Sequence, residues 1–159
     1  HLVFLVRPWF TNVSKRMIKS PKLYFCDVGV AAWLLGVRAI GHFQAHPQRG
    51  ALFENWGMTE LLKAQTHRGL KPSLHFLRDK EGHEIDALIE TAPNTFHAVE
   101  IKSGETIASD FFRGLDFWRA KLVGQSLKPW LIHGGTARQE REKATVLPWN
   151  GLGELLDRI

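Results

Sequence analysis

The chain has 159 residues, of which 44% are apolar and 23% charged, a composition that excludes a disordered chain and suits one domain with a hydrophobic core. Its single cysteine excludes an internal disulfide framework, and no apolar run approaches the ~20 residues of a membrane-spanning helix. The net charge of +5 belongs to the first third: residues 1–50 carry seven Lys and Arg against one Asp, whereas residues 51–159 carry 14 basic and 15 acidic side chains.

The first predicted elements form a basic hairpin. Residues 2–10 and 22–26 are rich in strand-forming side chains and flank the polar, basic stretch 11–22, which is typical of two strands joined by a long turn. Asp27 can cap a short helix that ends at Gly36. Because the chain starts without methionine inside an apolar strand, we expect it to be part of a longer protein.

A loop that contains Gly41, Pro47 and Gly50 leads into the second group of elements. The predicted helices cover 51–67, 110–122 (capped by Ser109) and 152–159, and the predicted strands cover 74–78, 83–90, 97–102, 129–133 and 145–149, with a charged connection over 137–143. This order of helices and strands behind a hairpin predicts a mixed α/β fold. No secretory signal is visible, so we expect a cytoplasmic protein.

The strand over 97–102 pairs an acid with an amine. Strand side chains alternate between faces, so Glu100 and Lys102 share one face while Val99 and Ile101 point to the other. The carboxylate can hold a divalent cation, and the ammonium can orient or help deprotonate a water bound to it. The alternative is a simple ion pair on a solvated edge strand.

A second carboxylate lies on the preceding strand. Ile85, Ala87 and Ile89 are expected to alternate inward, which leaves Asp86 on the opposite face. If the two strands pair, Asp86 approaches Glu100 closely enough to share a metal ion, because a cation relieves the repulsion of two carboxylates. The alternative is a polar outer face.

A third carboxylate lies on the helix over 51–67. Glu54 sits between Met58 and Leu61 in the apolar arc of this helix. A lone carboxylate there is costly unless it is paired, protonated or bound to metal. The alternative is partial exposure in the first helical turn, where the helix dipole favours an acid.

These side chains form an ordered set of four: Glu54, Asp86, Glu100 and Lys102. The set resembles the PD-(D/E)XK nuclease superfamily, whose pattern is a first-helix Glu, a hairpin Asp and a (D/E)-x-K strand followed by a helix. The resemblance covers residues 50–133 and implies a restriction-endonuclease-like αβββαβ core with a mixed sheet flanked by helices. It implies that Asp86, Glu100 and the carbonyl of Ile101 ligate Mg²⁺ or Mn²⁺, that Lys102 positions the attacking water, and that Glu54 completes the site. The superfamily's proline before the Asp is absent, since isoleucine stands there.

Longer motifs cover nearly the whole chain: KSPKLYFCDVGVAAWLLG over 19–36, GALFEN over 50–55, FLRD over 76–79, EID over 84–86 and VEIKSG over 99–104. They resemble the C-terminal domain of a family of prokaryotic AAA-type ATPases, known as domain of unknown function 4143. The resemblance implies that an ATPase module and a winged helix precede this domain. Residues 1–36 are then a hairpin and short helix left from the winged helix, and residues 37–159 are the nuclease-like domain. No P-loop motif occurs in the sequence, so no ATP site is assigned to it.

Basic side chains are candidates for phosphate contacts: Lys15, Arg16, Lys19, Lys22 and Arg78. The first hypothesis is a Mg²⁺-dependent phosphodiesterase that acts on DNA and holds its backbone without reading sequence. The alternative is a catalytically silent nuclease-like module that binds nucleic acid or partner proteins for the ATPase. In a third hypothesis, residues 1–26 only pack against that ATPase. An oligomer is compatible with all three.

Overall fold

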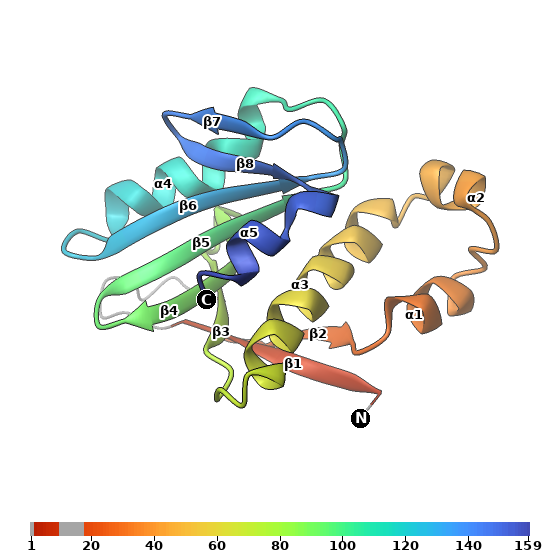
Figure 1. Cartoon of the computed structure of the whole chain (residues 1–159), viewed down its shortest axis with the longest axis horizontal. Helices are drawn as coiled ribbons and strands as arrows, with labels where there is room; N and C mark the ends of the chain where they lie inside the picture. Colours follow the sequence, from red (N-terminus) through yellow and green to blue (C-terminus); the bar gives the residue numbers. More distant parts are fainter. Residues whose placement is uncertain (1, 10–17) are drawn as a thin grey trace.

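The computed structural model describes residues 2–9 and 18–159, and these form a mixed eight-stranded sheet in the order β2-β1-β3-β4-β5-β6-β8-β7 (Figure 1). The strands are β1 (Val3–Pro8), β2 (Lys22–Phe25), β3 (Leu74–Arg78), β4 (Glu84–Ala92), β5 (Thr95–Lys102), β6 (Ser126–His133), β7 (Gln139–Arg141) and β8 (Ala144–Pro148). The helices are α1 (Val28–Leu34), α2 (Ile40–Ala45), α3 (Arg49–His67), α4 (Arg113–Lys121) and α5 (Gly153–Leu156), with 3₁₀ turns at Ser109–Phe112 and Trp149–Gly151. The predicted mixed α/β class is confirmed, and the restriction-endonuclease-like core stays a prediction.

The strand pairing makes β5 a central strand. β3, β4 and β5 form an antiparallel meander, and β6 and β8 continue the sheet parallel to β5. Parallel neighbours need a crossover connection, which α4 provides between β5 and β6. The carboxyl ends of β5 and β6 therefore lie at the same edge of the sheet.

Apolar side chains cover both faces of the sheet. On one face, Met58 and Leu61 of α3 pack with Val99 and Ile101 of β5, and Leu155 of α5 belongs to the same core. The second core gathers buried side chains of the sheet and of α4, among them Leu77, Ile85, Leu88, Leu115, Trp118 and Leu131. Figure 1 shows α3 and α5 on the face opposite α4. Glu100 on β5 is therefore buried among packed side chains, whereas Lys102 at the end of the strand is partly exposed.

The predicted hairpin is confirmed where the structure describes it. β1 and β2 are antiparallel, with Leu5 opposite Leu23. β1 also runs parallel to β3, so the hairpin is the edge of the same sheet. The predicted basic tip, with Lys15 and Arg16, lies outside the described residues. The division of the chain at residue 36 stays a prediction.

The helix that follows the hairpin is confirmed in detail, and three other expectations are wrong. Asp27 accepts the N–H of Gly29 at 2.7 Å and so caps α1. The expected loop contains α2, whose start at Ala39 has no side-chain cap that would have marked it. Ser109 begins a 3₁₀ turn without capping it, and α4 starts only at residue 113. The charged connection holds β7, which exists through its pairing with β8.

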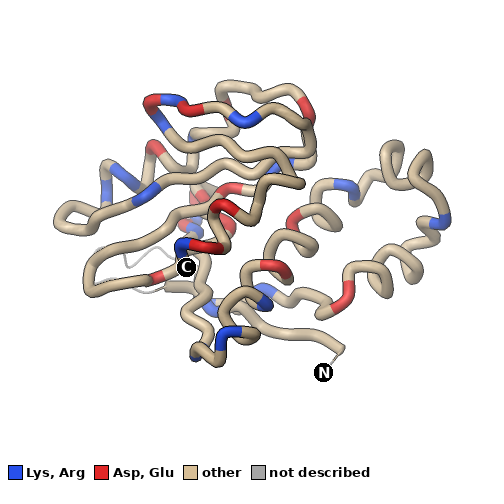
Figure 2. The backbone as a smooth tube through the Cα atoms, in the orientation of Figure 1, with Lys and Arg blue, Asp and Glu red and all other residues tan. Residues whose placement is uncertain are grey.

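Charged side chains are unevenly spread over the fold. Figure 2 shows a nearly uncharged arm made of α1 and α2, where Arg38 is the one Lys, Arg, Asp or Glu between residues 28 and 45. Across residues 2–9 and 18–159, no helix combines the length and apolar character needed to cross a membrane. The charged groups that meet near the sheet come instead from β2, α3, β4 and β5.

Candidate metal centre

The centre forms where β4 and β5 part. Their pairing runs up to Ala87 and Val99 and does not continue to the next opposed positions, Asp86 and Glu100. Instead, Oδ2 of Asp86 accepts the N–H of Ile101 at 2.8 Å. A side-chain oxygen thus replaces the missing backbone partner and fixes the Asp86 carboxylate against the end of β5.

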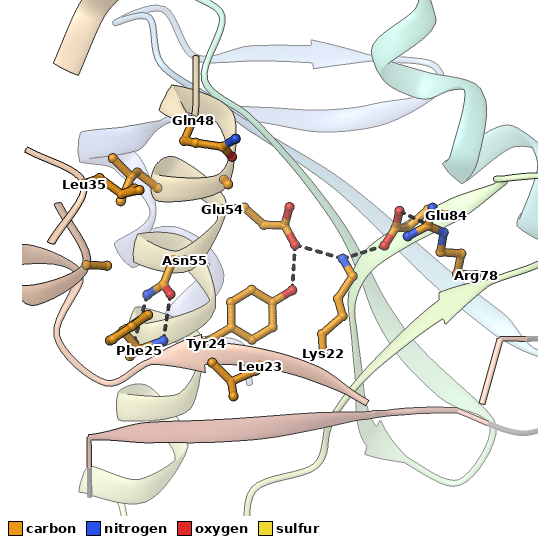
Figure 3. Close-up of a pocket in the computed structure, with 13 residues that line it drawn as sticks. Lys22, Leu23, Tyr24, Phe25, Leu35, Gln48, Glu54, Asn55, Arg78 and Glu84 are labelled. Atoms are coloured by element: carbon orange, nitrogen blue, oxygen red, sulfur yellow. Dashed lines mark hydrogen bonds and ion pairs between the residues drawn. The ribbon is translucent and has the colours of Figure 1, made fainter. Parts of the chain in front are cut away.

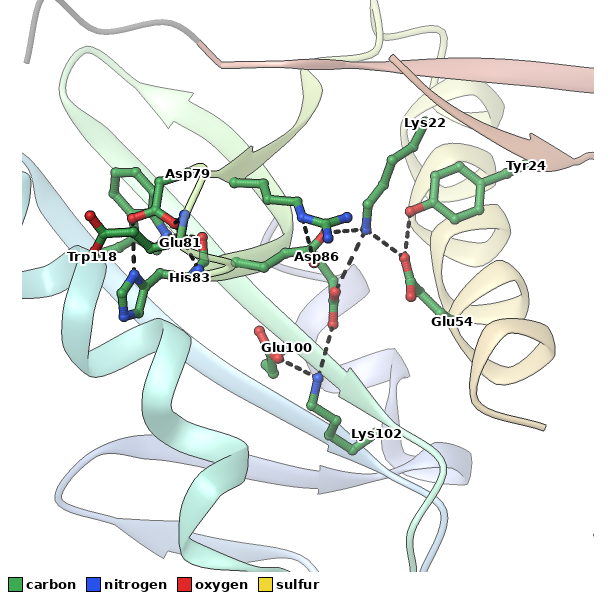
Figure 4. Close-up of polar contacts among 12 residues, drawn as sticks. Lys22, Tyr24, Glu54, Asp79, Glu81, His83, Asp86, Glu100, Lys102 and Trp118 are labelled. Carbon is green, nitrogen blue, oxygen red and sulfur yellow. Dashed lines mark hydrogen bonds and ion pairs between the residues drawn. The ribbon is translucent and has the colours of Figure 1, made fainter. Parts of the chain in front are cut away.

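The predicted alternation in β4 is wrong at its first apolar residue. Ile85 packs with Leu88 in the core beside α4, whereas Ala87 and Ile89 pack in the core beside α3. The pairing of β4 with β3 shifts register between the pairs His75–Leu88 and Leu77–Ile85, so β4 carries one extra residue there and the alternation changes face. Asp86 nevertheless points toward β5, as expected (Figure 4).

Glu100 and Lys102 lie on the central strand, so the alternative of a solvated edge pair is wrong. Glu100 is 5% exposed and Asp86 is 4% exposed. The Lys102 ammonium forms an ion pair with Oε1 of Glu100 and lies 3.8 Å from Oδ2 of Asp86. Oε2 of Glu100 is buried and has no hydrogen-bond partner within the described part of the chain. One helix packs closely over it, since a Cβ added to Gly114 of α4 would lie 3.5 Å from this oxygen.

Glu54 reaches the same centre from α3, and it is paired. Its Oε1 accepts the hydroxyl of Tyr24 at 2.6 Å and the ammonium of Lys22 at 2.8 Å (Figure 3). Lys22 also lies 2.5 Å from Oε1 of Glu84 and 3.9 Å from Oδ1 of Asp86. The four predicted residues and Lys22 are therefore linked by one continuous set of ion pairs (Figure 4).

Two acids of the centre, Asp86 and Glu100, have a raised pKa. Burial, together with the charge of Glu54, raises the pKa of Asp86 to about 6, although Lys102 and Lys22 oppose the shift. Burial and the Asp86 charge raise the pKa of Glu100 to about 8. Burial alone would lower the pKa of Lys102, but Asp86 and Glu100 outweigh it and raise that pKa. The raised pKa of Lys102 reflects the negative charge of Asp86 and Glu100, which favours a cation beside them.

Two residues of the centre were not singled out from the sequence. Tyr24 lies two positions after Lys22 on β2, and strand alternation puts both on one face. Glu84 lies two positions before Asp86 on β4. That spacing was the available signal in both strands. The two-residue spacing does not show that this face of β2 packs against α3.

The predicted phosphate contacts are scattered. Lys19 is exposed, and Arg78 is about half exposed with its Nε 3.8 Å from Oε2 of Glu84. Lys22 faces the carboxylates described above, and its role as a phosphate contact stays a prediction. Lys15 and Arg16 lie outside the described residues.

A second group of possible ligands closes the turn between β3 and β4. Ligand atoms of Asp79, Glu81 and His83 lie within 4.8 Å of one another, the one such trio found in residues 2–9 and 18–159. Asp79 accepts the backbone N–H of Glu81 and of His83, both at 2.9 Å. The His83 ring stacks on Phe117 with centroids 3.7 Å apart. Asp79 thus closes the turn between the strands predicted over 74–78 and 83–90.

The donor set of the main centre fits a hard divalent cation. Carboxylate and carbonyl oxygens are the ligands that Mg²⁺ and Mn²⁺ prefer. Glu100 has a buried, unpartnered Oε2, and its Oε1 binds the Lys102 ammonium, which also lies near Asp86. The backbone N–H of Ile101 is bound to the Asp86 carboxylate. A buried polar atom without a partner is costly, so a ligand there would relieve a real penalty.

Comparison with known proteins places most of the chain in one family. Residues 49–152 match the family described as domain of unknown function DUF4143. The chain belongs to this family. Residues 1–40 match a second one, domain of unknown function DUF8612. Glu54, Asp86, Glu100 and Lys102 therefore lie in the DUF4143 segment, whereas Lys22 and Tyr24 lie in the DUF8612 segment.

Two curated relatives of the chain are described as uncharacterised proteins. The chain is 31% identical over 100 residues to an uncharacterised protein of Mycobacterium bovis and, with the same figures, to one of Mycobacterium tuberculosis. The match covers 62% of this chain and 21% of each relative, so the chain spans about a fifth of their length. No solved structure matches the chain.

Proposed function

We propose that this DUF4143 domain is a Mg²⁺-dependent phosphodiesterase that acts on DNA, within the PD-(D/E)XK superfamily and attached to an AAA-type ATPase in the native protein. The observation that carries the proposal is the buried, unpartnered oxygen of Glu100 beside Asp86, with the Lys102 ammonium between the two carboxylates. A buried polar group without a partner calls for an explanation, and a ligand or a reaction at the centre would supply one.

Each residue has a distinct part in this proposal. Asp86, Glu100 and the carbonyl of Ile101 would hold Mg²⁺, which when bound supplies positive charge for the phosphate oxygens and acidifies water. Lys102 would hold the attacking water by donating hydrogen bonds, because its ammonium already lies between the two acids. Glu54 lies on the side of Asp86 away from Lys102 and would hold the Lys22 ammonium in place beside Asp86.

A cleft adjoins the centre on the side of Lys22, and its lining does not include Asp86, Glu100 or Lys102. It has a volume of about 590 Å³ and is lined by Lys22, Glu54, Arg78 and Glu84, among others. Arg78 is half exposed and can turn to a phosphate oxygen. A contact of this kind reads charge rather than base sequence, so we expect cleavage without strong sequence preference.

One observation favours a second function, a catalytically silent module that binds nucleic acid or partner proteins. Lys22 and Lys102 already form ion pairs with Glu54, Glu84 and Glu100, so the cluster has internal counter-ions. A centre neutralised in this way can be stable without metal.

The two functions differ in cleavage. Supercoiled and linear DNA are incubated with the protein and Mg²⁺ or Mn²⁺, beside a Lys102→Ala variant and the matched control Lys71→Ala, whose side chain is exposed on a loop. The phosphodiesterase predicts nicking by the wild type and by the control, with a loss of about 100-fold or more in Lys102→Ala. Cleavage that survives in Lys102→Ala refutes the assignment. Absence of cleavage in the wild type, with DNA binding retained, favours the silent module.

A further inference from the structure

Lys22 is placed unlike an ordinary surface lysine. Its Nζ lies 2.8 Å from Oε1 of Glu54, 2.5 Å from Oε1 of Glu84 and 3.9 Å from Oδ1 of Asp86. These three oxygens come from two elements that are distant in sequence from β2. The ammonium also lies 5.4 Å above the ring of Phe76, which contributes a cation–π contact.

The position of Lys22 is fixed by the packing of β2 on α3. The backbone N–H and C=O of Phe25 both bond to the side-chain amide of Asn55, at 2.8 Å each. Tyr24 is buried, stacks on Phe4 and donates its hydroxyl to the same Oε1 of Glu54 that binds Lys22. The side chain of Lys22 is only 21% exposed. β2 therefore delivers the ammonium to a defined place.

That place is a position for a cation, surrounded by carboxylates. Three carboxylate oxygens converge on it, and one of them belongs to Asp86. The other oxygen of Asp86 faces Lys102 and the buried oxygens of Glu100 lie beyond (Figure 4). Asp86 is thus flanked by two cation positions. One adjoins Glu100, and the other is occupied by the protein's own ammonium.

The charge balance agrees with a single added ion. When all four carboxylates are ionised, they and the two ammonium groups leave a charge of −2 at the centre, before the half-exposed Arg78 at the rim is counted. One divalent ion neutralises this charge, whereas a second would have to displace Lys22 or be repelled by it. Removing the ammonium leaves −3 and opens the position among Glu54, Glu84 and Asp86.

We propose, building on the metal-binding step of the proposed function, that Lys22 is a built-in second cation that limits the centre to one divalent ion, bound on the Asp86–Glu100 side. The DUF8612 segment thereby completes a centre whose acids all belong to the DUF4143 segment. Lys22 acts by occupying the place among Glu54, Glu84 and Asp86 and by holding these carboxylates in position, and it needs no contact with substrate.

The test counts bound Mn²⁺ from the loss of the free-ion electron paramagnetic resonance signal. Wild type and the control Lys19→Met, which changes an exposed lysine of the same segment, should bind one ion per chain. Lys22→Met and Lys22→Gln should bind two, because the vacated carboxylates accept the second ion. One ion in both Lys22 variants, or two in the wild type, overturns the proposal.

Two further measurements, thermal melting in Mn²⁺ and DNA cleavage, distinguish a folding defect from a change in metal binding. If a Lys22 variant is unfolded without metal, Mn²⁺ should restore its melting transition, since the ion replaces the lost charge. A variant that stays unfolded in Mn²⁺ overturns the proposal. The one-to-two pattern without DNA cleavage supports the role of Lys22 while refuting the phosphodiesterase. No Mn²⁺ binding to the wild type removes the basis of both.

Discussion

Replacing Glu100 by glutamine should stabilise the metal-free protein at alkaline pH. Glu100 is buried, and burial with the Asp86 charge raises its pKa from 4.5 to about 8. The folded protein therefore binds this proton more tightly than the unfolded chain does. The stability that the proton contributes is fully present below about pH 4.5 and is lost as the pH rises through about 8. Glutamine has no charge to bury, so Glu100→Gln escapes this loss.

The size of this stabilisation follows from the shift in the pKa of Glu100. Each pKa unit is worth about 1.4 kcal/mol, so a move from 4.5 to about 8 corresponds to an upper bound of about 5 kcal/mol. Water and the nearby ammonium of Lys102 adjust around the ionised acid and recover part of this cost. We expect Glu100→Gln to raise the free energy of unfolding by about 2–3 kcal/mol at about pH 9, and by almost nothing near pH 4.5.

Urea denaturation in the presence of a chelator measures this difference at both pH values. Glu90→Gln is the matched control, because Glu90 lies on β4 but is exposed. A Glu100→Gln variant that is less stable than the wild type at alkaline pH would refute the reasoning, as would an equal difference at both pH values. Added Mg²⁺ should stabilise the wild type and not the variant, so the difference in their free energies of unfolding at alkaline pH should shrink.

Two further predictions concern packing and acid stability. Gly114→Ala should lower the free energy of unfolding by about 3 kcal/mol or more, because the new Cβ would lie 1.8 Å from the carbonyl oxygen of Glu84. The control Gly153→Ala meets open space and should leave the free energy of unfolding unchanged. Equal urea midpoints for the two variants would contradict this prediction. His97 accepts the indole N–H of Trp130, and burial with nearby Lys128 and Arg158 lowers its pKa to about 4. The stability that neutral His97 contributes is present above about pH 6.5 and is lost as the pH falls through about 4. In His97→Gln, the free energy of unfolding should therefore fall by about 3 kcal/mol less between these pH values than in the wild type. The same pH dependence in both proteins would contradict this role of His97.

The parts of the fold that the sequence predicted well carry local signals. Asp27 and Gly36 marked both ends of α1, and apolar patterning with the turn after residue 78 marked β3 and β4. α2 and β7 carry no such signals. α2 starts without a capping side chain, and β7 is a charged tripeptide that becomes a strand only by pairing with β8. Tertiary contacts decide such elements, and local preference does not reveal them.

The same distinction applies to the centre. Alternation along β5 was enough to put Glu100 and Lys102 on one face, and helical spacing was enough to put Glu54 toward the core. The ion pair between Lys22 and Glu54 joins residues 32 positions apart. It depends on which face of β2 meets α3, which no short pattern encodes. Lys22 was therefore assigned to a phosphate contact on charge alone.

The position of the hairpin also changes how the DNA-binding hypotheses should be tested. β1 pairs with β3, and Val6 and Tyr24 belong to the same core as α3. Deleting residues 1–26 would remove two strands and the Lys22 ion pairs at once, so lost DNA binding in such a deletion would not identify a DNA contact. Charge reversal at exposed Lys19 leaves these contacts in place. A reduced salt dependence of DNA binding in that variant is therefore the specific sign of a phosphate contact by the hairpin.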